Sequence, residues 1–366
     1  MILFIVFVLA IVFTVVESQI NVMPELHSPS KRNVFIGAKI LVLLMFLLCA
    51  LRRLDVGIDT LHYYESYKSG MTRFVEVGYW IIRNVSLLLG GSFQVFLSLF
   101  ALSALGPLYK MLSRESINVS FSLLIYLSFS NFFYPEAFNT IRASAAIGFF
   151  VLALSYWSRE EYRCSIPLLI ISCLFHVSSI AACGLLMIAQ VFHRIPRSVT
   201  YIAVIISIVF GIAFQTGFSE YADSISLWLA GVSGDFAEYY YQHFASLEGT
   251  DFNIVGTLSN MLPFSLFTIV LYDKKNSSCI FYKLFTMGVI LSNIFISVTL
   301  IYRITMFFTI FLIVVLPNSM NRLKGNSRIF SMLLITFMLS WYVYKLFVAS
   351  SDNMAGILPY SFFFQR

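Results

Sequence analysis

Residues 142–157, RASAAIGFFVLALSYW, decide the fold predicted for this chain. From Ala143 onward the segment is almost entirely apolar, and its length approaches the roughly 20 residues that carry a helix across a membrane. Its first residue is nevertheless an arginine, and a guanidinium near lipid is costly unless it serves a pathway or an anionic ligand. The segment therefore predicts a membrane helix with a functional charge at one end.

The composition extends this interpretation to the whole chain. Of the 366 residues, 59% are hydrophobic and 11% are charged, whereas average soluble proteins carry roughly 25% charged residues. We therefore predict an all-α, polytopic transmembrane helical bundle that forms a single integral membrane domain over residues 1–366. The net charge of +6 is attributed to cytoplasmic loops and not to a nucleic-acid surface. The five cysteines lack metal-ligand spacing, so no metal site or cofactor is expected.

Apolar segments are predicted to form about 12 membrane helices, within a range of about 10–13. They lie near residues 1–17, 35–51, 91–109, 117–134, 142–157, 165–175, 178–192, 199–216, 253–272, 281–300, 302–317 and 329–349. The first lacks a basic leader and a cleavage site, so it is interpreted as a helix and not as a removed signal peptide. The sixth and seventh are short and share one apolar run around His176, which predicts a broken or re-entrant pair.

The distribution of charge predicts the orientation. Most of the 24 basic residues fall on six connections, which the positive-inside rule places in the cytoplasm. The segment 217–252 contains six acidic residues and no Lys or Arg, so it is predicted to be an acidic extracytoplasmic loop. A second extracytoplasmic loop, 52–90, contains an amphipathic stretch that is expected to lie along the membrane interface.

Several arginines then remain on the outer face, against the general rule. Arg52 and Arg53 follow the second apolar segment, while Arg142 and Arg303 are expected to begin the fifth and eleventh helices. Guanidinium groups bind phosphate oxygens in a bidentate manner, so two such residues suit two phosphates. We interpret them as candidate anion-binding residues.

Further polar residues map to the same side. Asp59, Tyr63 and Tyr67 are spaced four apart and share one face of a helix that Asp59 or Thr60 would cap; this face suits a sugar, or is simply a capped interfacial helix. Glu76 is an acid near the interface, or an exposed loop residue. The segment PEAFNTIR, with Glu136, Asn139 and Arg142, leads into small residues that allow close packing. His176 precedes Ser178 and is either a proton-transfer group or a satisfied core histidine.

Taken in this order, these segments resemble the EpsG family of bacterial polysaccharide polymerases, which are related in role to the Wzy O-antigen polymerases. The resembling residues are Asp59–Tyr67, Asn139-x-x-Arg142-x-x-x-Ala146, Phe175-His176-x-Ser178, Arg303 and Leu358-Pro359-Tyr360. The resemblance implies an enzyme that joins oligosaccharide repeat units carried on polyprenyl (undecaprenyl) diphosphate at the outer face of the bacterial inner (plasma) membrane. It also implies membrane lipid, a flippase and a chain-length co-polymerase as partners, in O-antigen, capsule or exopolysaccharide synthesis.

Under this hypothesis Arg142 and Arg303 stabilise the leaving diphosphate. The base is His176, Asp59 or Glu136, and His176 is favoured because arginines weaken a nearby carboxylate base. The residues expected to bind substrate are Arg52, Arg53, Tyr63, Tyr67, Glu76, Asn139 and Ser178.

The alternatives are a lipid-linked oligosaccharide flippase or other transporter, an O-antigen ligase, and an acyltransferase. A transporter is expected to show paired repeats with matched broken helices, and an acyltransferase a His-carboxylate motif. Neither pattern is evident in the sequence, and the loop 217–252 is short for a ligase.

Overall fold

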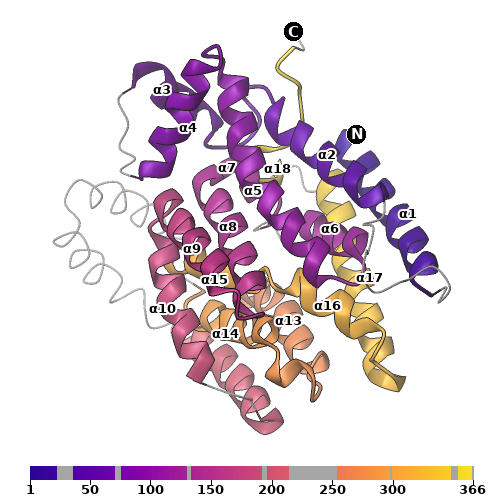
Figure 1. The fold of residues 1–366 in the computed structure, drawn as a ribbon. Helices are drawn as coiled ribbons and strands as arrows, with labels where there is room; N and C mark the ends of the chain where they lie inside the picture. The colour runs from indigo at the N-terminus through magenta and orange to yellow at the C-terminus, as the bar shows by residue number, and fades with distance from the viewer. Residues whose placement is uncertain are drawn as a thin grey trace.

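The computed structural model of the chain is a bundle of helices (Figure 1). It describes residues 1–22, 36–70, 76–129, 133–191, 196–213, 254–296, 299–347 and 353–364. Over these ranges no β-strand occurs, and extended pairing is limited to one bridge between Arg52 and Phe362. The all-α prediction is confirmed. The predicted acidic loop 217–252 lies outside the described residues.

The helices are numbered in chain order. In the first part of the chain they are α1 Ile2–Val22, α2 Ile36–Ala50, α3 Thr60–Ser69, α4 Val77–Leu88, α5 Phe93–Glu115, α6 Val119–Ser128, α7 Glu136–Asn139 and α8 Ile141–Trp157. The remainder are α9 Tyr162–Phe175, α10 Ser178–Val191, an unlabelled helix Arg197–Ala213, α13 Ile254–Val270, α14 Ile280–Ile294, α15 Thr299–Thr309, α16 Leu312–Met320, α17 Gly325–Phe347 and α18 Asn353–Gly356.

Four helical stretches of the described chain are long and apolar enough to cross a membrane: Ile2–Ile20, Phe93–Glu115, Gly325–Phe347, and Arg303–Met320, which runs through α15 and α16. The other apolar helices have 10–17 residues, short of the roughly 20 needed for a complete crossing. Each predicted apolar segment therefore contains an apolar helix, which makes the chain a membrane protein. The number of complete crossings stays a prediction.

Helix α8 lies at the centre of the bundle, and its small residues explain why. A Cβ atom added to Gly148 would lie 2.5 Å from the carbonyl oxygen of Ala104 on α5, so the two backbones touch at this crossing. Ala143, Ala145 and Ala146 of α8 are buried, as expected where small side chains let helices approach. On its other side, α8 packs along α9.

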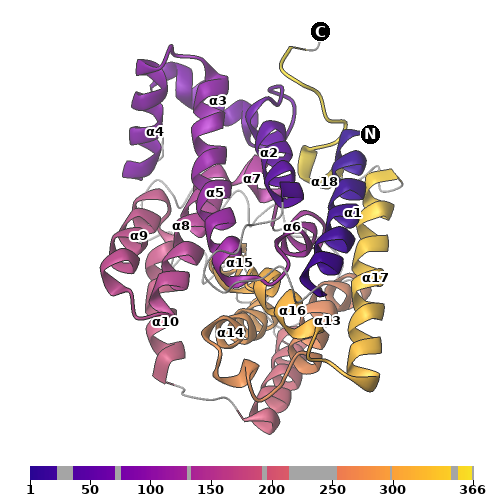
Figure 2. The same cartoon turned by 45° about the vertical axis from the view of Figure 1, so that its right-hand side comes forward.

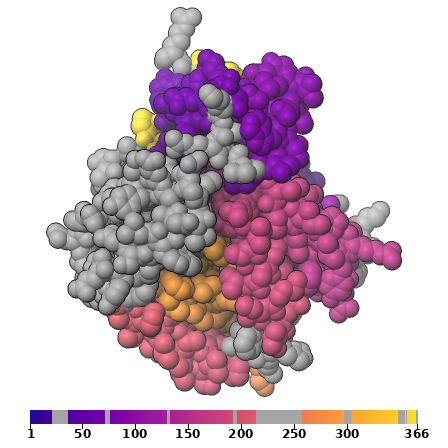
Figure 3. Space-filling model, turned by 90° about the vertical axis from the view of Figure 1, so that its left-hand side faces the viewer, coloured from indigo at the N-terminus to yellow at the C-terminus, as the bar shows by residue number. Residues whose placement is uncertain are grey.

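Helices α3 and α4 form a lobe at one end of the bundle (Figures 1 and 2). In the space-filling view this lobe, coloured purple, stands above the pink surface of α9 and α10 (Figure 3). Gly78 of α4 allows the contact, because a Cβ there would lie 2.9 Å from the carbonyl oxygen of Leu174. The helix predicted within the loop 52–90 is thus present as α4, while its position at a membrane surface stays a prediction.

Two boundaries differ in detail from those predicted. The break at His176 separates α9 from α10, as the short sixth and seventh segments indicated. The predicted helix 302–317, however, begins earlier and is divided into α15 and α16. The division lies where Phe311 N–H donates to the carbonyl of Phe308, a tightened three-residue turn.

Candidate active site

Arg142 lies in the first turn of α8 and joins three helices. Its Nη1 donates to Oε2 of Glu76 at 2.5 Å, and both side chains are largely shielded, at 14% and 15% exposure. Arg142 also donates a hydrogen bond to the hydroxyl of Tyr63 on α3. The predicted positive charge at the start of this helix is therefore held between α4 and α3.

Glu76 is placed for this pairing by the start of α4. It occupies the N-cap position, but its side chain makes no capping hydrogen bond. Its carboxylate contacts the guanidinium of Arg142 instead. Both residues were candidates from the sequence, but their pairing was not foreseen, because no periodicity connects residues so far apart along the chain.

Arg303 reaches the same place from α15. It interacts electrostatically with Tyr63 and with His176, and Arg142 interacts with the same two groups. We call Tyr63, Arg142, His176 and Arg303 the Arg142 cluster. One expectation is corrected, since α15 begins at Thr299 and Arg303 therefore lies in its second turn. The predicted boundary followed the charge, whereas Thr299 and the apolar residues after it continue the helix toward the N-terminus.

Hydroxyl groups on either side of His176 fix the connection that carries it. The hydroxyl of Ser172 donates to the carbonyl of Ala146 at 2.7 Å, and the hydroxyl of Ser179 donates to the carbonyl of Ser172 at 3.0 Å, which ties the α9–α10 connection to α8. The backbone N–H of Ser178 donates to Nδ1 of His176 at 3.2 Å. Because Nδ1 accepts this bond, the neutral imidazole carries its proton on Nε2. The contribution of Ser178 to this contact is its backbone, not its hydroxyl.

The surroundings of His176 also determine its charge. His176 lies in the connection between α9 and α10, outside both helices. Burial, together with the positive charges of Arg142 and Arg303, lowers the pKa of its imidazole to about 3. The argument that a nearby arginine weakens a carboxylate base therefore applies to His176 as well. Near neutral pH this side chain is an uncharged Nε2–H donor.

Asp59 occupies the N-cap position of α3, next to the cluster. The predicted side-chain cap is absent, because the Asp59 side chain makes no capping hydrogen bond to the first turn of α3. Thr60 instead donates to the carbonyl of Val56 at 2.6 Å. The carboxylate of Asp59 interacts electrostatically with Tyr63. Tyr63 is buried, and its burial raises the pKa of its phenol above the ordinary value. Asp59 is thus a half-buried carboxylate that interacts with Tyr63, the same residue with which Arg142 and Arg303 interact.

Glu136 and Asn139 lie on α7, just before Arg142. The carboxylate of Glu136 accepts from the hydroxyl of Thr140 at 2.6 Å. Asn139 is buried against the turn at Gly57, where a Cβ atom would lie 2.9 Å from its Oδ1. Gly57 adopts a φ of +91°, so this turn both requires glycine and leaves space for Asn139. These contacts connect α7 to the loop that carries Asp59.

The structure places Arg52 in the interior. It is 1% exposed, and its guanidinium donates to the carbonyls of Phe138 at 2.8 Å and Cys49 at 3.3 Å. The Cys49 carbonyl belongs to the last turn of α2, where carbonyls lack partners within the helix. Arg52 therefore fastens α2 to α7, while the substrate contact that the sequence suggested stays a prediction.

Arg53 and Tyr67 also lie apart from the Arg142 cluster. Arg53 forms an ion pair with Asp55, and the two side chains are 42% and 52% exposed. Tyr67 packs its ring against Phe96 at a centroid distance of 5.0 Å, and its hydroxyl accepts from Ser86 at 3.3 Å. Tyr79 was not among the predicted site residues, but it is fully buried and interacts electrostatically with Tyr63 and Arg142. Its position beside Glu76 was the available signal.

This arrangement suits an anion and a polar ligand together. Two guanidiniums from different helices interact electrostatically with one phenol and one imidazole, and charge-assisted hydrogen bonds from arginine are well matched to phosphate oxygens. In the described part of the chain no group of three or more His, Cys, Asp or Glu side chains is placed to hold a metal ion. The chemistry supported here is binding of a phosphorylated compound with a carboxylate and a hydrogen-bond donor nearby.

Comparison with known proteins gives one match. The model of the EpsG family matches residues 37–362, a range that contains every candidate site residue from Arg52 to Arg303. No curated protein and no solved structure matches the chain. Because the match extends over most of the sequence, the chain belongs to the EpsG family.

Proposed function

We propose that this protein is a polysaccharide polymerase that joins oligosaccharide repeat units carried on polyprenyl (undecaprenyl) diphosphate. The EpsG family is associated with glycosyltransferase-like polymerase activity in membranes. One observation supports a diphosphate-linked substrate. Arg142 on α8 and Arg303 on α15 interact with the same pair of groups, Tyr63 and His176, which provides two positive charges for a diphosphate.

The reaction breaks one bond and forms another. In the donor, the bond between the anomeric carbon of the growing chain and the phosphate oxygen of its lipid carrier breaks. The anomeric carbon then bonds to a hydroxyl oxygen of the acceptor repeat unit. The hydroxyl proton passes to a base, and polyprenyl diphosphate leaves with the electron pair of the broken bond.

Arg142 and Arg303 are assigned to the leaving diphosphate, whose negative charge increases as the bond breaks. Fixed donors directed at developing charge contribute about 3–4 kcal/mol each in comparable enzyme sites. Glu76 holds one nitrogen of Arg142, so the guanidinium keeps its position before substrate arrives. This preorganisation favours the transition state over the ground state.

The remaining roles follow from protonation. We assign the base to Asp59, because it lies beside Tyr63 and its side chain is not engaged in capping α3. His176 is assigned as an Nε2–H donor to an oxygen of the diphosphate or of the donor sugar, since its Nδ1 already accepts from Ser178. Tyr63 is a neutral phenol within hydrogen-bond reach of Arg142 and completes the polar wall.

The proposal places this site on the extracytoplasmic face of the bacterial inner (plasma) membrane. The acidic segment 217–252, which has no Lys or Arg, and the basic residues on the six predicted cytoplasmic connections favour that orientation under the positive-inside rule. A flippase that supplies lipid-linked units and a co-polymerase that sets chain length are the expected partners. The product belongs to O-antigen, capsule or exopolysaccharide synthesis.

Deletion of the gene, followed by analysis of the surface glycan and of lipid-linked intermediates, tests the proposed function. A polymerase deletion is expected to replace a polymer ladder with single repeat units that accumulate on the outer leaflet. Single units trapped on the inner leaflet would instead indicate a flippase. A normal ladder that stays on its lipid carrier would indicate a ligase, and either result would overturn the proposal.

A further inference from the structure

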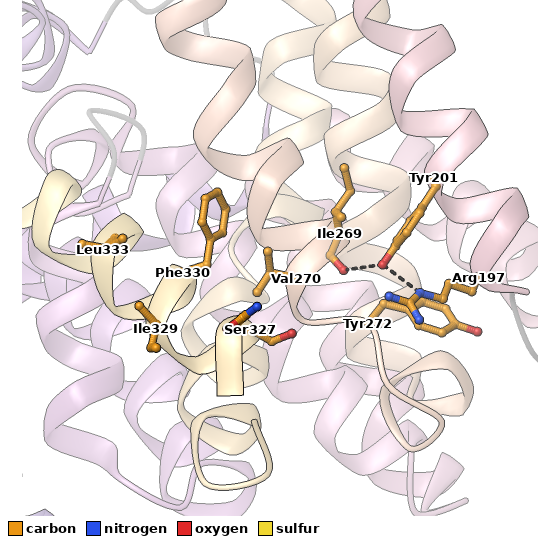
Figure 4. Close-up of a pocket in the computed structure, with 10 residues that line it drawn as sticks. Arg197, Tyr201, Ile269, Val270, Tyr272, Ser327, Ile329, Phe330 and Leu333 are labelled. Atoms are coloured by element: carbon orange, nitrogen blue, oxygen red, sulfur yellow. Dashed lines mark hydrogen bonds between the residues drawn. The ribbon is translucent and has the colours of Figure 1, made fainter. Parts of the chain in front are cut away.

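A cavity of about 470 Å³ lies between the start of the helix Arg197–Ala213, the end of α13 and the start of α17 (Figure 4). One wall is polar and aromatic and comprises Arg197, Tyr201 and Tyr272. The opposite wall is the apolar face of α17, with Ile329, Phe330 and Leu333. Its size falls within the range of ligand-binding pockets, roughly 300–1,000 Å³. The Arg142 cluster contributes no residue to it.

The guanidinium of Arg197 is oriented by a short chain of hydrogen bonds. Its Nε donates to the hydroxyl of Tyr201 at 2.8 Å, and that hydroxyl donates to the carbonyl of Ile269 at 3.3 Å (Figure 4). The guanidinium carbon also lies 5.1 Å from the centre of the Tyr201 ring. Within the described residues no acceptor is bonded to the two terminal nitrogens of Arg197, so they remain available to an anionic group.

The apolar wall continues along the outer surface of α17. Ile329, Leu333, Phe337 and Trp341 follow one another at intervals of four, and their side chains are 45–61% exposed. Residues four apart share one face of a helix, so they form a continuous apolar stripe that starts in the cavity. In a membrane protein such a surface faces lipid tails.

The cavity is lined by segments next to basic connections. Residues 192–198, 273–279 and 321–328 contain seven of the predicted cytoplasmic Lys and Arg residues, including Arg197. Arg322 bonds to Asp273 at 3.0 Å, which holds two of these connections together beside the cavity. Basic pockets between membrane helices on the cytoplasmic side bind anionic lipid headgroups, and Tyr side chains are typical of this depth.

We propose that this cavity binds an anionic phospholipid of the cytoplasmic leaflet, with the phosphate on Arg197 and an acyl chain along the α17 stripe. The occupant is a membrane lipid and not a soluble phosphate, because the apolar wall is as extensive as the polar one. The site is independent of the proposed polymerase reaction and holds even if that reaction is different.

Native mass spectrometry of the detergent-purified full-length chain, titrated with phosphatidylglycerol, tests the proposal. The wild type is expected to bind phosphatidylglycerol more tightly than phosphatidylcholine with the same acyl chains. Arg197→Ala is expected to weaken phosphatidylglycerol binding about fivefold, the factor for losing one basic residue beside an anionic leaflet. Tyr201→Phe is expected to weaken it less, because it only removes the hydroxyl that orients Arg197.

The matched control is Arg163→Ala, which removes an exposed arginine from another predicted cytoplasmic connection. It is expected to bind phosphatidylglycerol like the wild type. If Arg163→Ala and Arg197→Ala weakened phosphatidylglycerol binding equally, the loss would reflect general surface charge, and the proposal would be overturned. Soluble glycerol phosphate that competes as strongly as the lipid would overturn it too, since the apolar wall would then contribute nothing.

Discussion

Arg52 and Arg142 are both shielded from solvent, yet their guanidiniums contact different kinds of group. Arg52 bonds to backbone carbonyls of α2 and α7, so its charge serves the fold. Arg142 contacts a carboxylate and a phenol, and a second arginine lies near the same phenol. Backbone carbonyls bond to the terminal nitrogens of Arg52, although its buried Nε has no partner among the described residues. Arg142 is already paired with Glu76, and the second positive charge, on Arg303, favours an anionic ligand.

Substitutions of Arg142 test its proposed role in polymer synthesis. Arg142→Ala is expected to reduce polymer yield at least about 100-fold while the protein remains in the membrane, because one fixed donor to the leaving group is lost. Arg142→Lys is expected to recover little, since lysine lacks the bidentate fork. The measurement is the glycan ladder, normalised to the amount of protein in the membrane. Lys68→Ala, an exposed charge on α3, is the control, and equal polymer in all three variants would refute the assignment.

Replacing Arg52 tests the structural role. Arg52→Met is expected to lower the free energy of unfolding by about 2–4 kcal/mol, because buried carbonyls of Cys49 and Phe138 lose their donor. Thermal unfolding in detergent measures this, with Arg53→Met as the exposed comparison that leaves the midpoint unchanged. A stable Arg52→Met protein that fails to make polymer would instead place Arg52 at the substrate.

The charge of His176 predicts a pH dependence of stability. Its pKa is about 3 in the folded protein against an ordinary value of 6.5, so between these values the unfolded chain binds more protons. Stability is therefore present above pH 6.5 and is lost as the pH falls toward 3. His176→Gln is expected to reduce the fall in melting temperature between pH 7 and pH 5. His62→Gln, at an exposed histidine, keeps the full decrease, and identical curves for both variants would contradict the assignment.

At the scale of elements, the close crossing of α5 and α8 positions the site. Gly148 of α8 lets the two helices touch. Ser172 of α9 donates to the carbonyl of Ala146, which also lies on α8. The start of α8, with Arg142, and the connection that holds His176 are thus fixed relative to one another. Rigid helices, and not loops alone, set the geometry of the cluster.

A pair of glycine substitutions tests this crossing. Gly148→Ala is expected to lower the free energy of unfolding by about 1–3 kcal/mol, because the added methyl forces two backbones apart. Gly184 lies within α10 with no atom within 4 Å of an added Cβ, so Gly184→Ala is expected to leave stability unchanged or slightly raised. Thermal unfolding of both variants measures the difference in stability. Equal midpoints would show that the crossing is not tight.

At the scale of the whole molecule, apolar segments meet so that residues from both halves of the chain form one cluster. Apolar runs and the break at His176 were predictable, because hydrophobic length and interruptions are local features of sequence. The identities of Arg142, Arg303, Tyr63 and His176 were predictable because charged and polar groups stand out among apolar neighbours.

Other features could not be read from local patterns. The pairing of Glu76 with Arg142, the burial of Arg52 and the packing of Tyr67 depend on which helices become neighbours. The start of α15 at Thr299 carries no capping signal in the sequence. The proposed donor role of His176 rests on the Ser178 N–H, which bonds to Nδ1, a matter of backbone geometry and not of composition.

Binding of a prenyl diphosphate to the purified full-length protein tests the central claim most directly. Farnesyl diphosphate, with farnesyl monophosphate as the comparison, reports whether Arg142 and Arg303 together hold a diphosphate. The account predicts that Arg142→Ala and Arg303→Ala each weaken diphosphate binding at least about tenfold, as expected for loss of a charged hydrogen-bond partner, while Lys68→Ala binds like the wild type. Unchanged diphosphate affinity in both arginine variants would contradict it.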